Sequence, residues 1–311
     1  MKVATSLVHA SWIPERVETI KRLRVSLGVE IPELAIEDLP AHSFANASGV
    51  QPAKTPLGPY HEETIRGPSW VWQEDQFRWF ATTDADVLFV TQDDQRTPGA
   101  KLFWSTFLAM LEGSQAKIIC FHTGLPAART LFAAGEVAYT TVDGLVGQGY
   151  AMRRDVALDF QSFRANELVA DAFDCTALNT FTRSEDNLIG LFAMTRGIRI
   201  WHPIPTIIDH DLSIASTNEG YDSHLYRSSQ VTWEDARRTD HPIEWNSPER
   251  WAAPPVHLGM FYDAQHGIHM YAPLMLRDRA RGEELAREIA KDVCPLPYRK
   301  FFHRLQAGAG E

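Results

Sequence analysis

The sequence predicts an α/β layer fold with a mostly parallel central sheet flanked by helices. Short apolar runs typical of buried strands alternate with segments whose apolar residues recur every three or four positions, as in helices that face a core. The chain has 311 residues, and 44% of them are apolar. This is enough material for one large domain or two modest ones.

The first half of the chain opens with a strand over residues 2–10 and a helix that starts near Pro14. Apolar residues at positions 17, 20, 23 and 27 give this helix one buried face, and Gly28 ends it. Residues 40–68 are rich in Pro, Gly, Ser, Asn and His, which favours a long functional loop such as a mobile lid. The other expected elements are strands at 34–37, 86–91 and 117–121 and helices at 70–80 and 99–111.

The second half continues the alternation. Strands over 137–142 and 148–152 flank a glycine-rich segment, Ser184 can cap a helix that Gly197 ends, and a strand follows at 198–201. Beyond residue 215 the tryptophans lie among Pro, Asp and Arg, and a charged helix is expected over 275–293. We therefore expect residues 1–215 to form the α/β domain and residues 216–311 an α-rich C-terminal extension packed on it.

Charge and cysteine content narrow the classes of function. The 40 Asp and Glu residues against 30 Lys and Arg give a net charge of −10, which disfavours a general nucleic-acid backbone binder. The three cysteines form no C-x-x-C pair, which argues against a disulfide framework and a structural zinc. Neither an apolar run near the ~18 residues of a membrane span nor a secretory signal is evident. We expect a cytoplasmic protein.

The most informative segment is an apolar strand that ends in two adjacent carboxylates, Asp93 and Asp94. Side chains at the carboxyl ends of strands face the ligand crevice of an open α/β sheet. Mg²⁺ or Mn²⁺ binds one or two protein carboxylates and leaves positions for phosphate oxygens and water, so a divalent-cation site is one interpretation. The other is an ordinary turn before Pro98, where Asp is favoured by local hydrogen bonding.

Four segments in the same order resemble the nucleotide-sugar glycosyltransferases of the GT-A fold, and phage and bacterial enzymes in particular. They are the opening strand at 3–8 with the Arg-bearing helix after it, the sequence Gln-Asp-Asp-Gln at 92–95, the glycine-rich strand and Arg at 146–154, and Ser-Glu-Asp-Asn at 184–187 with the Pro, His and Ser of 204–213. Gln92 replaces the first carboxylate of the family's metal motif. The resemblance implies a GT-A-like (Rossmann-like) fold.

The resemblance also implies roles for individual residues. Asp94 would bind Mn²⁺ or Mg²⁺ with His210 completing the coordination, and Asp93 would share the metal or hold the ribose and sugar of the donor. Asp186 would take the proton of the acceptor hydroxyl, with Glu185 as the alternative base. The other donor-binding residues that it implies are Thr5, Ser6, Arg16, Gly149 and Arg153.

Several of these residues also have plainer interpretations. His210 could be a hydrogen-bonded histidine at the sheet edge, and Asp186 and Glu185 could only complement the dipole of a helix that Ser184 caps. Tryptophans 70, 72, 79 and 104 are expected mostly in the core. Histidines 257, 266 and 269 lack a recognised metal-ligand spacing.

Together these implications describe a metal-dependent, inverting glycosyltransferase that moves a sugar from a nucleotide-sugar donor to a hydroxyl of a glycan, a protein or a modified DNA base. The C-terminal extension would face the acceptor. The net charge disfavours DNA, although Arg and Trp residues of the extension could form a local basic, stacking surface. Two other classes stay open. One is a nucleotidyl- or phosphoryl-transfer enzyme, weakened by the lack of a phosphate-binding loop motif, and the other is a non-catalytic nucleotide-sugar-binding protein.

Overall fold

The structure is a computed structural model, and it describes residues 1–30, 53–64, 69–121, 126–142, 149–169, 185–211, 214, 231–238, 244–258 and 275–291. The strands are β1 Val3–His9, β2 Lys54–Thr55, β3 Gly58–Thr64, β4 Val87–Gln92, β5 Gln95–Arg96, β6 Ile118–Cys120, β7 Ala138–Thr141, β8 Tyr150–Arg153, β9 Ile200–Pro203, β10 Asp209–His210 and β11 Val256–His257. The helices are α1 Pro14–Leu27, α2 Ser69–Thr82, α3 Ala100–Ser114, α4 Pro126–Ala133, α5 Arg154–Asn166, α7 Glu185–Thr195, α9 Trp233–Arg237, α10 Pro248–Trp251 and α12 Arg279–Lys291.

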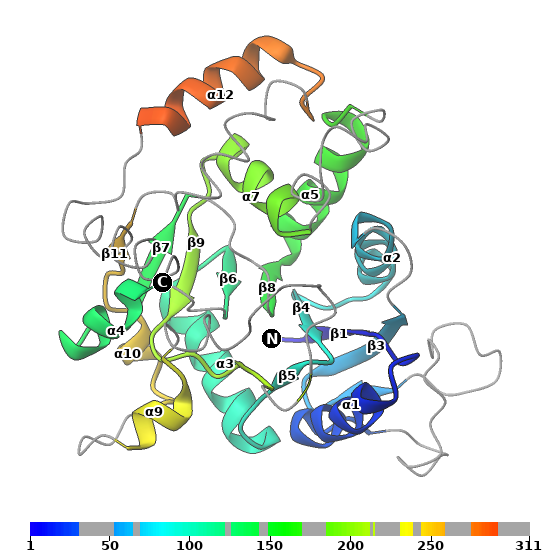
Figure 1. Cartoon of the computed structure of the whole chain (residues 1–311), viewed down its shortest axis with the longest axis vertical. Coiled ribbons are helices and arrows are strands. Elements are labelled where there is room, and N and C mark those ends of the chain that lie inside the picture. The colour runs from blue at the N-terminus through cyan, green and yellow to red at the C-terminus, as the bar shows by residue number, and fades with distance from the viewer. Residues whose placement is uncertain are drawn as a thin grey trace, which may run out of the picture.

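A sheet in the order β11-β7-β9-β6-β8-β4-β1-β3-β2 runs through the molecule (Figure 1). Strand β1 lies between β3 and β4 and is parallel to both. Strand β8 lies between β4 and β6 and is antiparallel to both. Strands β1, β3, β4, β6 and β9 therefore run in one direction and β2, β7, β8 and β11 in the other. The predicted α/β fold with a large, mostly parallel sheet is confirmed, and the sheet is mixed.

Helices cover both faces of this sheet (Figure 1). Because side chains alternate along a strand, Val3 and Leu7 of β1 join the apolar cluster that includes residues of α1 and α3. Ala4 and Val8 join the opposite cluster, to which α2, α5 and α7 contribute. Both faces of the central strands are thus buried, which explains why these strands read as continuous apolar runs.

The described parts of the C-terminal extension pack on the same core. Helix α10 lies against α3 at Gly113, where an added Cβ atom would stand 2.1 Å from the carbonyl oxygen of Pro248. Leu285 of α12 is 3% exposed and belongs to the cluster on the α2 face. The Val169 backbone N–H also donates to the Met275 carbonyl at 2.8 Å. No helix in the described ranges is long and apolar enough to cross a membrane.

The prediction of an unbroken loop over residues 40–68 is wrong for residues 53–64. These form β2 and the seven-residue β3 at the edge beside β1. Strand β3 looks polar because it carries His61, Glu62 and Glu63, but all three side chains are buried. Partners elsewhere in the fold compensate Glu62, so tertiary contacts override the local pattern. The strand expected at 34–37 lies outside the described residues.

The other predicted strands and helices correspond to elements of the structure. Trp72 and Trp104 are each 4% exposed, as expected of core residues. Helices α4 and α5, which the sequence analysis did not single out, complete the alternation of strands and helices.

Candidate functional site

The candidate site lies where several strand ends meet. Strands β1 and β4 are neighbours and parallel, so their carboxyl ends share one edge of the sheet, and Asp93 directly follows β4. Strand β8 runs the opposite way with Tyr150 beside Val90, which brings the preceding residue, Gly149, to the same edge. In open α/β sheets such an edge is where ligands bind.

Asp93 holds this edge together. It is 1% exposed, its Oδ1 pairs with the guanidinium of Arg16, and its Oδ2 accepts the backbone N–H of Ala10 at 2.6 Å. Its own N–H donates to the Val8 carbonyl at 3.0 Å. Both carboxylate oxygens are therefore engaged, and Asp93 ties the end of β4 to β1 and to the first turn of α1.

Asp93 also has a perturbed acidity. The pKa of its carboxyl is raised to about 6, mainly by burial and in smaller part by the neighbouring Asp94 carboxylate. The Arg16 guanidinium and the Ala10 N–H act in the opposite direction. The raised pKa shows that the contacts of Asp93 do not fully offset the loss of hydration.

Asp94 is the residue with spare bonding capacity. It is 8% exposed, and its Oδ2 lies 3.5 Å from Nη1 of Arg16 and 3.8 Å from Nδ1 of His210. Its Oδ1 is buried and has no hydrogen-bond partner within the described ranges. We call this atom the open oxygen. Because a buried acceptor without a partner is costly, it is a natural point for a ligand.

His210 contacts Asp94 although it lies 116 residues further along the chain. Strand β10 pairs antiparallel with β5, placing His210 opposite Gln95. The carbonyl oxygen of Asp94 accepts the ring N–H of His210 at 3.1 Å and the backbone N–H of Asp211 at 2.7 Å. Since a carbonyl can only accept, Nδ1 carries the proton, and Nε2 keeps its lone pair in the neutral ring. Nε2 can therefore ligate a metal.

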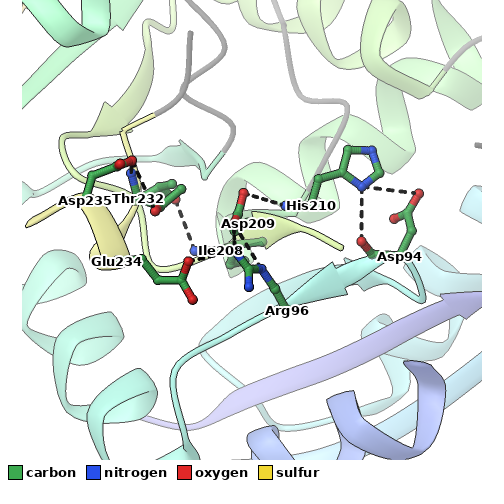
Figure 2. A network of polar contacts seen from close by, with 9 residues as sticks. Asp94, Arg96, Ile208, Asp209, His210, Thr232, Glu234 and Asp235 are labelled. Atoms are coloured by element: carbon green, nitrogen blue, oxygen red, sulfur yellow. Dashed lines mark hydrogen bonds and ion pairs between the residues drawn. The ribbon is translucent and has the colours of Figure 1, made fainter. Parts of the chain in front are cut away.

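A clamp on the opposite side of this two-stranded ladder fixes its position. Arg96 donates to Asp209 at 2.5 and 3.0 Å and to Glu234 at 2.9 Å, and its guanidinium lies 5.6 Å from the ring centroid of Trp233. Figure 2 shows Arg96 and Asp209 in this clamp and His210 turned towards Asp94. The clamp thus anchors the segment that delivers His210.

Gln95 is a site residue that the sequence analysis missed. Its Oε1 accepts the hydroxyl of Thr91 at 2.6 Å and the backbone N–H of Gln92 at 3.2 Å, so the side chain folds back under the turn that carries the two aspartates. Its Nε2 is buried and has no acceptor in the part of the chain that the structure describes. We call this group the open amide. Only its position after the aspartate pair could have drawn attention to it.

Gly149 is required where it stands. Its φ of +74° is in the left-handed region that favours glycine. An added Cβ atom would lie 2.8 Å from Cδ1 of Ile208 and 3.2 Å from Oε1 of Gln95. The glycine therefore allows β8 to approach both Gln95 and the segment that leads to His210.

Three of the residues predicted to bind the donor are not brought to this edge. Arg153 lies at the other end of β8, beside Val87, and donates to the carbonyls of Leu111 at 2.6 Å and Ala116 at 2.8 Å. Thr5 and Ser6 lie within β1, both 0% exposed. The Ser6 hydroxyl accepts a hydrogen bond from Gln76 at 2.9 Å. Thr5 and Ser6 therefore belong to the interior of the fold, and the half-buried Arg153 binds backbone carbonyls at the opposite end of β8.

The structure describes other predicted residues only in part. Glu185 and Asp186 lie in the first turn of α7, but their side chains are outside the described residues, as are Ser184, His266 and His269. His257 is exposed on β11, where its Nδ1 is 2.8 Å from the Thr140 hydroxyl. Among the described residues no group of three His, Cys, Asp or Glu side chains could hold a metal ion. A cation at Asp94 and His210 would therefore need oxygen atoms from its ligand or from water.

A second buried ionic cluster lies on the same face of the sheet as Arg16. The Arg24 guanidinium donates to both oxygens of Glu62, at 2.6 and 2.5 Å, and the Tyr60 hydroxyl donates to Oε1 at 2.6 Å. Nε2 of His9 lies 3.8 Å from Oε2. Burial, together with the Glu62 carboxylate, raises the pKa of Tyr60 well above its ordinary value. We call Arg24, Glu62 and Tyr60 the closed cluster, and Arg16, Asp93 and Asp94 the open cluster.

No protein-family model and no curated protein matches the chain.

Proposed function

We propose that this chain is a glycosyltransferase of GT-A type that moves a sugar from a nucleotide-sugar donor to a hydroxyl acceptor with the help of Mn²⁺ or Mg²⁺. The observation that carries the proposal is the open oxygen of Asp94, buried at the carboxyl end of β4 beside the ring of His210. This is where an α/β sheet binds its ligand.

The donor set suits a hard divalent cation shared with a diphosphate. Asp94 would bind through the open oxygen and His210 through Nε2, and phosphate oxygens and water would complete the coordination. When bound, such a cation neutralises the charge that develops on a leaving diphosphate. Asp94 is preferred over Asp93 as the ligand, because each oxygen of Asp93 already accepts an N–H, from Arg16 and from Ala10. The role of Asp93 would be to position Asp94.

The proposed reaction also needs a base. Asp186, with Glu185 as the alternative, would accept the proton of the acceptor hydroxyl while its oxygen bonds to the anomeric carbon of the sugar. The bond from that carbon to the nucleoside diphosphate breaks with its electron pair, so the configuration at carbon inverts. The Asp186→Asn variant should bind donor normally and turn over at least ~100-fold more slowly. Near-normal turnover would remove Asp186 from the mechanism.

The acceptor would be a hydroxyl of a glycan, a protein or a modified DNA base, in the cytoplasm. The net charge of −10 favours the first two over DNA. The described residues of the C-terminal extension pack on the α/β core, which supports a position from which this extension could contact the acceptor.

The first experiment is a thermal-shift screen of UDP-, GDP-, ADP- and CMP-linked sugars, each with and without Mn²⁺ or Mg²⁺. A ligand at 100 times its dissociation constant stabilises the native state by ~2.7 kcal/mol, which is readily detected. A selective shift that requires the metal is expected. No shift with any donor, in wild-type protein of verified fold, would contradict the proposal.

Product analysis then separates the reaction classes. Release of a free nucleoside diphosphate from the selected donor supports sugar transfer. Release of pyrophosphate, or of a nucleoside monophosphate from a UDP-, GDP- or ADP-linked sugar, would instead identify nucleotidyl or phosphoryl transfer, whereas CMP is the product expected when sugar is transferred from a CMP-linked donor. Binding without turnover for any acceptor class would favour a binding protein.

A further inference from the structure

The side chain of Gln95 has a fixed orientation. An amide oxygen and nitrogen are told apart by their partners, and here one end of the amide faces the backbone N–H of Gln92, which can only donate. That end must be the oxygen, which also accepts the Thr91 hydroxyl at 2.6 Å. The open amide therefore points away from the turn with two N–H donors.

The β5–β10 ladder places Gln95 directly opposite His210, one of the two proposed metal ligands. Gln95 and His210 are directly opposite each other in an antiparallel pair, so their side chains lie on the same face of the ladder. The His210 ring on that face contacts Asp94. Arg96 and Asp209, the neighbouring pair, lie on the other face in the clamp (Figure 2). Gln95 thus lies on the face of the ladder that carries the His210 ring, and that ring contacts Asp94.

The burial of Gln95 makes an amide N–H without an acceptor costly. Gln95 is 2% exposed, and a buried N–H without an acceptor costs roughly 1–3 kcal/mol. A residue that only completed the turn would need its oxygen and not its NH₂ group. A ligand oxygen would satisfy the amide.

We infer that Gln95 positions the donor by donating hydrogen bonds from the open amide to an oxygen of its diphosphate. This inference rests on the proposed function and adds to it a contact that does not involve the metal. The diphosphate is preferred over the sugar because a diphosphate can contact the cation at Asp94 and an N–H donor nearby with different oxygens.

The Gln95→Glu substitution separates the two ends of the side chain. Glutamate keeps an oxygen for Thr91 and Gln92 but replaces the NH₂ group by an oxygen without a proton. We expect affinity for UDP, GDP, ADP or CDP with Mg²⁺, whichever the wild type binds, to fall at least ~10-fold in calorimetry, the scale of a hydrogen bond to a charged group. Gln76→Glu is the control, because it too replaces a buried glutamine, 0% exposed, by an acid. We expect it to change the affinity for the nucleoside diphosphate by less than about threefold.

A measurement on the wild-type protein tests the contact even if the Gln95→Glu variant does not fold. In ¹⁵N-labelled protein, the side-chain NH₂ signals of Gln95 are assigned by their loss in Gln95→Glu or Gln95→Met. Titration with the same four nucleoside diphosphates and Mg²⁺ should shift these signals and slow their exchange with water. A shift produced only by the sugar-linked form would overturn the assignment to the diphosphate.

The outcomes separate this inference from the proposed function. If a nucleoside diphosphate binds wild type, but Gln95→Glu binds it equally well and the amide signals do not move, Gln95 is only a turn residue and the proposed function stands. If none of the four binds the folded wild type, the inference is overturned, whereas the proposed function is overturned only if the sugar-linked donors also give no thermal shift. Weaker binding in Gln95→Glu together with a shifted amide supports the contact.

Discussion

Arg16 and Arg24, about two helical turns apart on α1, each form an ion pair with a buried carboxylate, and the two ion pairs differ. In the closed cluster Arg24 donates to both oxygens of Glu62, and Tyr60 adds a further bond. In the open cluster Arg16 pairs with Asp93 but only approaches Asp94, at 3.5 Å. The two arginines, Glu62 and Asp93 are each no more than 2% exposed.

Burial alone therefore does not distinguish a structural ion pair from the site that we propose for a ligand. Both clusters are buried and charged, and both join α1 to the central strands. What differs is the saturation of the acceptors, because Glu62 has bonds to both of its oxygens whereas Asp94 keeps the open oxygen. Saturated groups contribute to stability, and an unsaturated group retains capacity for a ligand. Four predictions test this distinction.

The largest effect is expected in the closed cluster. Glu62→Ala should lower the free energy of unfolding by about 3–5 kcal/mol, because the buried Arg24 guanidinium loses its carboxylate partner. Urea denaturation measures this. Glu30→Ala removes an exposed ion pair with Lys54 and should cost at most about 1 kcal/mol. Equal losses in both variants would mean that saturation of the buried pair contributes little.

Titration of Asp93 in the open cluster should make the free energy of unfolding depend on pH. With a pKa near 3.8 unfolded and about 6 folded, Asp93 binds its proton more tightly in the native state. Its contribution is therefore fully present below pH 3.8 and is lost as the pH rises to about 6, a change of ~3 kcal/mol.

Asp93→Asn removes this titration. Unfolding free energies of wild type relative to Asp93→Asn, measured in chelator from pH 3.5 to 7.5, should fall with rising pH up to about 6 and then level off. A relative stability that increases over this interval would show that the Arg16 ion pair outweighs the burial of Asp93.

At Asp94 we expect the reverse balance, with a large effect on ligand binding and a small one on stability. Asp94→Ala should weaken metal-dependent binding of the nucleoside diphosphate at least ~100-fold, equivalent to about 2.7 kcal/mol. The open oxygen has no bond to lose in the described structure, and the other oxygen only approaches Arg16 and His210, at 3.5 and 3.8 Å, so the unfolding free energy should change by less than about 1 kcal/mol. Unchanged calorimetric affinity with Mn²⁺ would end the assignment of Asp94 as a ligand.

The smallest effect concerns the glycine beside the open cluster. Gly149→Ala should destabilise by ~1–2 kcal/mol, because alanine is strained at a φ of +74°. Gly135→Ala is a matched control, with a φ of +84° and nothing within 4 Å of the added Cβ atom. Thermal unfolding of the two variants isolates the cost of approaching Ile208. A smaller loss for Gly149→Ala would show that this packing yields easily.

The sequence predicted the central strands and helices well because their periodicity is strong, and it predicted the aspartate pair because charge ends the apolar run of β4 abruptly. It could not predict β3, because its buried Glu62 depends on Arg24 of α1 as well as on Tyr60 of the same strand. It also could not give the direction of β8. Because β8 runs antiparallel to β4, Gly149 lies at the edge that carries Asp93 and Asp94. A strand rises ~3.3 Å per residue, so Arg153, four residues later, lies at the opposite end of the strand.

The double acceptance by the Asp94 carbonyl has a consequence for how the protein folds. The two groups that donate to it, the His210 ring and the Asp211 N–H, come from a segment 116 residues further along the chain. Contacts of such separation form slowly, because a long stretch of chain must be ordered before they gain anything. During synthesis on the ribosome, Arg16 and Asp93 can meet long before His210 exists. The nascent chain should therefore be able to pair β1, β3 and β4 first and bring His210 to Asp94 only later.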